Sequence, residues 1–149
     1  MGRPSRRMVL ALWGMTGLFW VAIFIATHLP PRNLPPVRVS DKTAHLLGYF
    51  VLTGLLYVSW WASNPRRQGL WLIVLLVVAS YATFDELLQV PVGRTADLAD
   101  WVADMVGAAA ALLICSAMRW WMLWRQRKDV EATMRRAVKP RPAPVPARR

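Results

Sequence analysis

The chain has 149 residues, of which 56% are hydrophobic, and its formal net charge is +11. This length suits a single domain, and the one cysteine, Cys115, excludes an intrachain disulfide. The positive charge does not predict a nucleic-acid partner, because the basic residues lie outside the apolar runs and no nucleic-acid-binding motif is present. The long uncharged runs instead predict an integral membrane protein in a lipid bilayer.

Four apolar runs follow one another, and each can supply the roughly 20 residues that a helix needs to cross a bilayer. The first run, 8–29, follows three arginines but has no small-residue cleavage site, so we expect an uncleaved helix rather than a signal peptide. The other runs are 43–62, 70–90 and 101–123. The predicted fold is all-α, an integral membrane bundle of four transmembrane helices in a domain spanning 1–124.

The basic residues also predict an orientation in the membrane. With the N-terminus inside, fifteen Lys and Arg residues lie on the cytoplasmic side and four lie outside, as the positive-inside rule requires. Both termini are therefore expected in the cytoplasm. The segment 125–149 is basic and then rich in proline, which predicts a disordered cytoplasmic tail that rests on anionic lipid.

Polar residues near the predicted outer ends of the runs are expected at one depth. Tryptophan favours the membrane interface, and one lies near the inner end of each run: Trp13, Trp61, Trp71 and Trp121. Each is separated by 15–17 residues, or about 22–26 Å of helix, from one of these polar residues: His28, His45, Glu86 and Asp104. Charges in lipid are costly, so these side chains should face inward and pair. We interpret His28, just before two prolines, mainly as a helix-end residue.

Helical spacing supports this polar layer. Residues four apart share a helix face, which groups Asp41, His45 and Tyr49 in one run. The last run carries a stripe of acidic and small residues that would let another helix approach closely: Asp97, Asp100, Asp104, Gly107, Ala108 and Ala111.

Two sequence blocks resemble the VanZ-like family: "DKTAHLLGYFVLTGLL" (41–56) and "DELLQVPVGRTADLADWVADMVGAAA" (85–110). The matching positions are Asp41, Lys42, His45, Tyr49, Glu86, Gln89, Gly93, Arg94, Asp100 and Gly107. The family's usual Asn is Asp104 here, which adds a negative charge. The resemblance implies a small multi-pass protein of the bacterial cytoplasmic (inner) membrane with a cell-envelope role. The family's namesake is associated with resistance to the glycopeptide antibiotic teicoplanin, and the resemblance supplies no mechanism.

Binding of a lipid-linked envelope intermediate is the first hypothesis for the polar layer. Lys42 and Arg94 would bind phosphate, and the other ligand-binding residues would be Tyr49, Gln89, Asp100 and Asp104. The second hypothesis is a membrane-embedded hydrolase or transferase, with His45 as general base oriented by Asp41 and Glu86 as general acid.

Three further possibilities complete the alternatives. A required divalent metal is not expected, because the sequence has no H-E-x-x-H motif and few histidines. If a metal is bound, its ligands would be Glu86, Asp100 and Asp104. Transport is disfavoured, because four spans are few and their inner halves are apolar, although an oligomer would supply more spans. A purely structural network of ion pairs is the remaining alternative.

Overall fold

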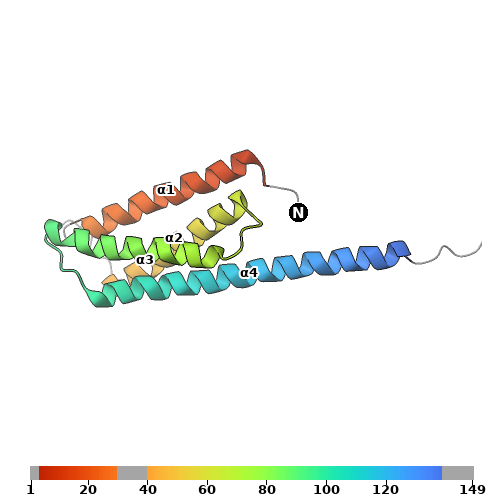
Figure 1. The fold of residues 1–149 in the computed structure, drawn as a ribbon. Helices are drawn as coiled ribbons and strands as arrows, with labels where there is room; N and C mark the ends of the chain where they lie inside the picture. The colour runs from red at the N-terminus through yellow and green to blue at the C-terminus, as the bar shows by residue number, and fades with distance from the viewer. Residues whose placement is uncertain (1–3, 30–39, 139–149) are drawn as a thin grey trace, which may run out of the picture. The chain divides into compact units, whose positions relative to one another are not determined.

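The structure, a computed structural model, describes residues 4–29 and 40–138, and in these ranges its regular elements are all helices, with no strand. Its elements are α1 (Arg6–His28), α2 (Asp41–Ser63), α3 (Leu70–Gln89), the short 3-10 helix η2 (Val90–Val92) and α4 (Leu98–Val138) (Figure 1). Within the described residues, four helices are long and apolar enough to cross a membrane. This confirms the predicted all-α fold with four candidate spans.

Local sequence explains where these helices begin and end. Ser5 and Ser40 precede α1 and α2, and their hydroxyls accept hydrogen bonds from the backbone N–H groups of Met8 and Thr43, as N-cap residues do. Gly93, with a φ of 81°, ends η2. That left-handed conformation favours glycine, and it turns the chain toward α4.

The structure corrects one predicted boundary. α4 continues to Val138, so residues 125–138 are helical, although the sequence analysis places them in a disordered tail. No proline or glycine lies between Gly107 and Pro140, so nothing in the sequence stops the helix earlier. The rest of the predicted tail, 139–149, lies outside the described residues.

The chain divides into two units, Met1–Ser116 and Ala117–Arg149. In the described part of the second unit, the Arg125 guanidinium lies 4.2 Å from the centre of the Trp121 ring, and Lys128 lies 3.8 Å from Glu131. Contacts between residues three or four apart support an exposed helix. This unit carries none of the candidate site residues.

In the first unit, α2 packs against the other three helices. Thr16 of α1 and Ser59 of α2 share a buried hydrogen bond of 2.8 Å, and Tyr49 and Leu56 of α2 lie in one core with Val74 and Val78 of α3. On α4, a Cβ added to Gly107 would overlap the backbone carbonyl of Leu46. The predicted close approach of another helix to the small-residue stripe is therefore confirmed, and the partner is α2.

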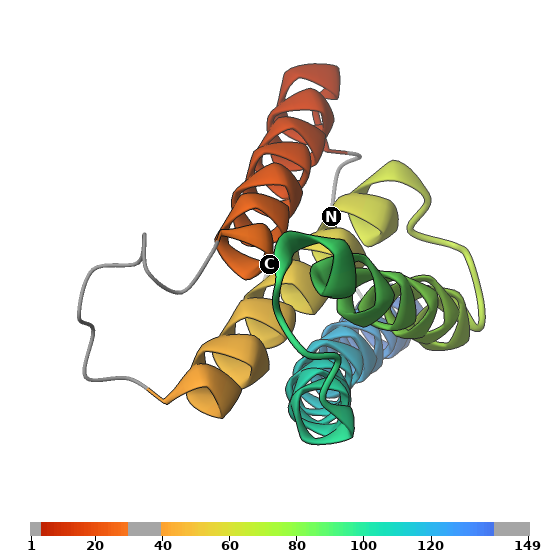
Figure 2. The ribbon, with the colours of Figure 1, turned by 90° about the vertical axis from the view of Figure 1, so that its left-hand side faces the viewer.

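One end of this unit gathers the polar residues. The C-terminal ends of α1 and α3 and the N-terminal ends of α2 and α4 lie together, and Figure 2 looks onto them. We call this the polar end. Elsewhere the outer faces carry large apolar side chains, for example Leu18 and Leu113, which are 74% and 72% exposed. Such faces suit contact with lipid tails.

Candidate functional site

The centre of the site joins three helices. The Nδ1 atom of His45 lies 3.0 Å from Oδ1 of Asp104 and 4.0 Å from Oε1 of Glu86. All three residues are buried, and we call them the His45 cluster. The predicted convergence of these three residues is therefore present in the structure.

The loop between η2 and α4 fixes Glu86 in place. The backbone N–H of Asp97 donates to Oε2 of Glu86 at 2.9 Å, and the Gln89 side-chain amide donates to Oε1 at 3.3 Å. The Asp97 carboxylate accepts from the Ala99 N–H at 2.8 Å, so Asp97 caps the N-terminus of α4. The Ala99 N–H, and then the Lys42 ammonium, hold the pKa of Asp97 below its usual range.

Ion pairs cover the cluster toward the polar end. Arg94 lies 2.9 Å from Asp41, and Lys42 lies 3.2 Å from Asp97 and 3.4 Å from Asp100. We call these contacts the outer ion pairs. Both cations that the sequence analysis assigns to phosphate binding are thus engaged by carboxylates, as the structural alternative expects.

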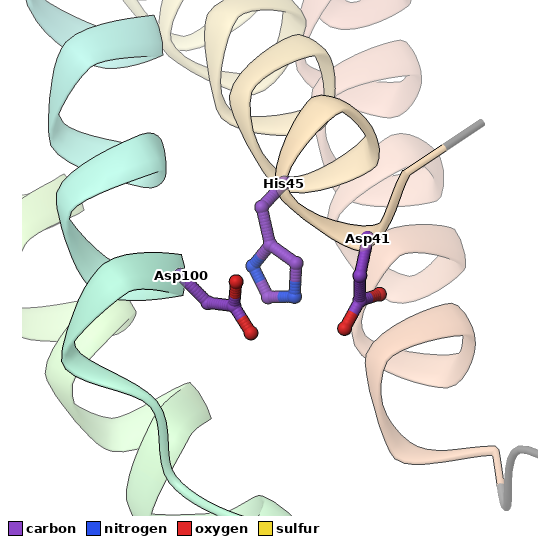
Figure 3. Close-up of side chains that lie close together, drawn as sticks. All are labelled: Asp41, His45 and Asp100. Atoms are coloured by element: carbon purple, nitrogen blue, oxygen red, sulfur yellow. The ribbon is translucent and has the colours of Figure 1, made fainter.

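The structure corrects the predicted orienting partner of His45. Asp104, and not Asp41, is bonded to Nδ1, because α4 packs directly against this face of α2. Asp41 lies one helical turn nearer the polar end, and Figure 3 shows it beside the second ring nitrogen, with Asp100 facing it from α4. Ligand atoms of Asp41, His45 and Asp100 lie within 4.8 Å of one another.

Two groups of three residues could therefore hold a metal ion among the described residues: Asp41, His45 and Asp100, or His45, Glu86 and Asp104. The sequence analysis grouped Glu86 with Asp100 and Asp104 and left His45 out. The structure instead makes His45 common to both groups and separates Asp100 from Glu86 and Asp104.

A groove of about 340 Å³ leads to this site from the side of the bundle. It lies between α3 and the beginning of α4 and is lined by Thr83, Glu86, Leu87, Ala96, Asp97, Leu98 and Trp101. The exposed walls are apolar, since Leu87 is 60% and Leu98 75% exposed. Glu86 is the residue that this groove shares with the His45 cluster.

A second polar region, which the sequence analysis did not separate from the first, lies between α1 and α3. Thr27 and Tyr81 donate to Oδ1 of Asp85 at 3.1 and 3.3 Å, and His28 Nδ1 lies 3.8 Å from the same oxygen. Asp85 is 1% exposed. We call these four residues the Asp85 cluster. His28 therefore lies beside Asp85, although the sequence predicts it in one layer with His45.

Several buried polar atoms have no hydrogen-bond partner among the described residues: His28 Nε2, Tyr49 OH, Thr53 Oγ1, Asp85 Oδ2 and Asp104 Oδ2. Buried polar atoms are nearly always paired, so each of these has unused capacity for a hydrogen bond or a ligand. Tyr49, expected to bind ligand, is fully buried behind His45, where it would not meet a large ligand directly.

Comparisons with known proteins agree with the resemblance seen in the sequence. The family model described as VanZ/LLP1 matches residues 9–122. An uncharacterized protein of the fission yeast Schizosaccharomyces pombe is 32% identical over 110 residues, which cover 73% of this chain and 63% of the yeast protein. The match thus spans less than two thirds of that relative. No solved structure matches the chain. The helices and the family match together show that this chain is a multi-pass membrane protein belonging to the VanZ-like family.

Proposed function

We propose that the protein binds a lipid-linked intermediate of glycan or envelope assembly at its polar end. The apolar chain of the ligand would lie in the groove, and its polar head would reach the His45 cluster. The observation that carries this proposal is the position of Glu86, which lines an apolar, lipid-facing groove and also lies 4.0 Å from His45. A ligand that enters from the bilayer could therefore present a polar group to buried acid and imidazole side chains.

The outer ion pairs suggest how a phosphate would bind. Arg94 and Lys42 are held by carboxylates of which Asp41 and Asp97 are about half exposed. A phosphate oxygen could replace such a carboxylate at Arg94, because guanidinium binds both groups with the same geometry. The displaced Asp41 would turn toward solvent. Exchange of partners would then neutralise the ligand's charge without leaving a buried cation unpaired.

The distribution of basic residues and the yeast relative indicate which side of the membrane the polar end faces and which class of ligand it binds. We propose that the polar end faces away from the cytoplasm, as the positive-inside rule predicts, and that the host membrane is a bacterial cytoplasmic membrane. Because one relative belongs to a yeast, the proposed ligand class is a lipid-linked glycan rather than a molecule confined to the bacterial wall. A contribution to glycopeptide resistance would be one consequence of binding such an intermediate.

A second candidate, a hydrolase or transferase acting on the same ligand, is favoured by the bond between His45 and Asp104. When neutral His45 donates from Nδ1 to this buried carboxylate, Nε2 remains as an acceptor on the side of the ring where Asp41 lies (Figure 3). A carboxylate that fixes the tautomer in this way is a familiar support for a general base. The base would deprotonate water or an acceptor hydroxyl, and Glu86 would protonate the leaving group.

The groove supplies the test. Binding of a polyisoprenyl diphosphate to the full chain in detergent would be measured by native mass spectrometry for wild type, Leu98→Trp and Leu18→Trp. Leu98 lines the groove, and Leu18 is equally exposed on α1, at 74% against 75%. We expect Leu98→Trp to weaken binding at least tenfold and Leu18→Trp to bind as wild type. Equal binding by both variants, or no binding by wild type, would contradict the proposal.

Catalysis needs a separate measurement. Release of the head group from the same lipid would be followed for wild type and His45→Gln. Wild-type turnover that His45→Gln abolishes, with lipid binding retained, would establish the enzyme. Binding without turnover in wild type would leave the protein as a binder.

A further inference from the structure

We propose that one divalent metal ion binds among His45 Nδ1, Glu86 and Asp104, the His45 cluster. The three donor atoms come from α2, α3 and α4, and all three residues are buried. Imidazole nitrogen with two carboxylates is a donor set that suits Mn²⁺ or Zn²⁺. The inference deepens the proposed function, and it rests on that function only for the role given to the ion.

Two of the three distances between donor atoms fit one ion, and the third, between Glu86 and Asp104, is at most 4.8 Å. Two ligand atoms on the same metal lie at most about 4.4 Å apart, because each bond measures roughly 2.0–2.2 Å. His45 Nδ1 lies 3.0 Å from an Asp104 oxygen and 4.0 Å from a Glu86 oxygen. An ion could therefore replace the proton between His45 and Asp104 with only small movements of the three side chains.

Charge and unused bonding capacity point the same way. The cluster places two carboxylates beside one imidazole, and burial of charge is costly unless it is compensated. Asp104 is fully buried, yet its Oδ2 atom has no partner among the described residues. A divalent ion would offset the negative charge of both carboxylates. It would also give the Asp104 Oδ2 atom a partner, which no hydrogen bond among the described residues provides.

The surroundings of the second ring nitrogen supply an independent argument. A histidine that binds metal through one nitrogen usually donates its other N–H to a carboxylate or carbonyl, which fixes the ring. Here Figure 3 shows Asp41 beside the other nitrogen, and ligand atoms of Asp41, His45 and Asp100 lie within 4.8 Å of one another. These two acids would orient His45, while Glu86 and Asp104 bind the ion.

The position of the ion would also give it a role. Glu86 lines the groove that opens to lipid, so an ion held by Glu86 would lie where the polar head of the proposed ligand arrives. Divalent ions bind phosphate oxygens strongly. The ion would thus bind the phosphate directly, and with metal on Nδ1 the Nε2 atom would carry a proton and would not act as a base.

The test uses Mn²⁺ alone, without any lipid, so that its outcome is separate from that of the lipid-binding test. The full chain would be freed of metal and titrated with Mn²⁺, with free ion followed by electron paramagnetic resonance. Pulsed measurements on the bound ion would show coupling to a directly bonded nitrogen. We expect one bound Mn²⁺ per chain with this ¹⁴N coupling, and affinity that falls at low pH, because the ligands must be deprotonated.

Variants identify the ligands. We expect Glu86→Gln and Asp104→Asn to bind Mn²⁺ at least about tenfold more weakly. Asp85→Asn is the matched control, because Asp85 is an equally buried acid next to Glu86 in the chain, and it should bind as wild type. Absence of bound Mn²⁺ or of the ¹⁴N coupling in wild type would overturn the proposal whether or not any variant folds. Loss of binding in Asp100→Asn with Glu86→Gln unaffected would overturn it in favour of the other group.

Discussion

Asp85 and Glu86 are neighbours in the chain and both are buried, yet they belong to two different polar regions. Asp85 points toward α1, and it accepts hydrogen bonds from Thr27 of α1 and Tyr81 of α3. Glu86 points toward α2 and α4, where it meets His45 and lines the groove. Successive residues of a helix point about 100° apart, which is enough to separate two sites. Among the described residues, the region around Glu86 combines a titratable cluster with a groove on the surface of the bundle.

The two regions also differ in how their charges are met. The Asp85 cluster relies on neutral donors and on His28, and it lies wholly between α1 and α3. The His45 cluster depends on α4 for Asp104 and is covered by the outer ion pairs. We therefore propose a structural role for the Asp85 cluster and a functional role for the His45 cluster, and the following changes would test that division.

The largest effect is expected for Gly107→Val. A side chain here would overlap the Leu46 carbonyl and force α4 away from α2, at a cost of at least about 3 kcal/mol in the free energy of unfolding. Denaturation in detergent would measure it. Gly54→Ala is the control, because no atom lies within 4 Å of a Cβ at that position, and stability there should hold or rise. Equal stability of the two variants would mean that α4 does not pack as described.

The next effect concerns the Asp85 cluster. Thr27→Val removes a hydroxyl that donates to a fully enclosed carboxylate, which should lower the free energy of unfolding by about 1–3 kcal/mol. Ligand and Mn²⁺ binding at the His45 cluster should not change. Thr133→Val serves as the stability control, because Thr133 is exposed and its hydroxyl donates to the Asp129 carbonyl of its own helix. A loss of ligand or Mn²⁺ binding in Thr27→Val would show that the two regions act as one site.

A smaller effect is expected for the Arg94–Asp41 pair. A double-mutant cycle with Arg94→Gln and Asp41→Asn should give a coupling of up to about 1 kcal/mol, because the Asp41 side chain is 56% exposed. The coupling should shrink in the presence of a polyisoprenyl diphosphate, whose phosphate would replace Asp41. If the lipid left the coupling free energy unchanged, the Arg94–Asp41 pair would have only a structural role and would not bind the phosphate.

The smallest effect follows from Asp97. Its pKa is lowered by the Ala99 N–H and by Lys42, so its ionised form stabilises the folded state at pH values above the ordinary aspartate pKa of about 3.9. That contribution is lost as the pH falls through the lowered folded-state value. Asp97→Asn should therefore have a slightly lower Tm than wild type at pH 7, and the difference should shrink as the pH falls below the ordinary aspartate pKa of about 3.9. Asp129→Asn, a change at an exposed acid outside the site, should match wild type at pH 7.

The sequence predicts the elements of this fold well because the apolar runs are long. The runs 8–29, 43–62 and 70–90 agree with α1, α2 and α3 to within two residues at each end. Gly107 also indicates a close helix contact without naming the partner. The predicted disorder of residues 125–138 was wrong. The many basic residues after 124 suggested a disordered tail, but a helix continues where proline and glycine are absent, as they are here before Pro140.

The site was predicted only in part, for a geometric reason. Spacing along one helix correctly grouped Asp41 with His45, yet it could not show that Asp104 of α4 would take the Nδ1 atom. Depth counted from tryptophans placed His28 level with Glu86, yet depth says nothing about rotation around the bundle. The separation of Asp85 from Glu86 depends on which neighbour each helix face meets, and that is a property of tertiary packing.

The most direct test of the division compares two isosteric variants, Glu86→Gln and Asp85→Asn, with wild type. Thermal unfolding of each full-length protein in detergent would be measured with and without a polyisoprenyl diphosphate. Functional sites are often strained, so neutralising Glu86 should leave Tm equal to or above that of wild type, while the rise in Tm on adding lipid disappears. Asp85→Asn should keep that rise. The account is contradicted if lipid stabilises Glu86→Gln as much as wild type, or if only Asp85→Asn loses the response.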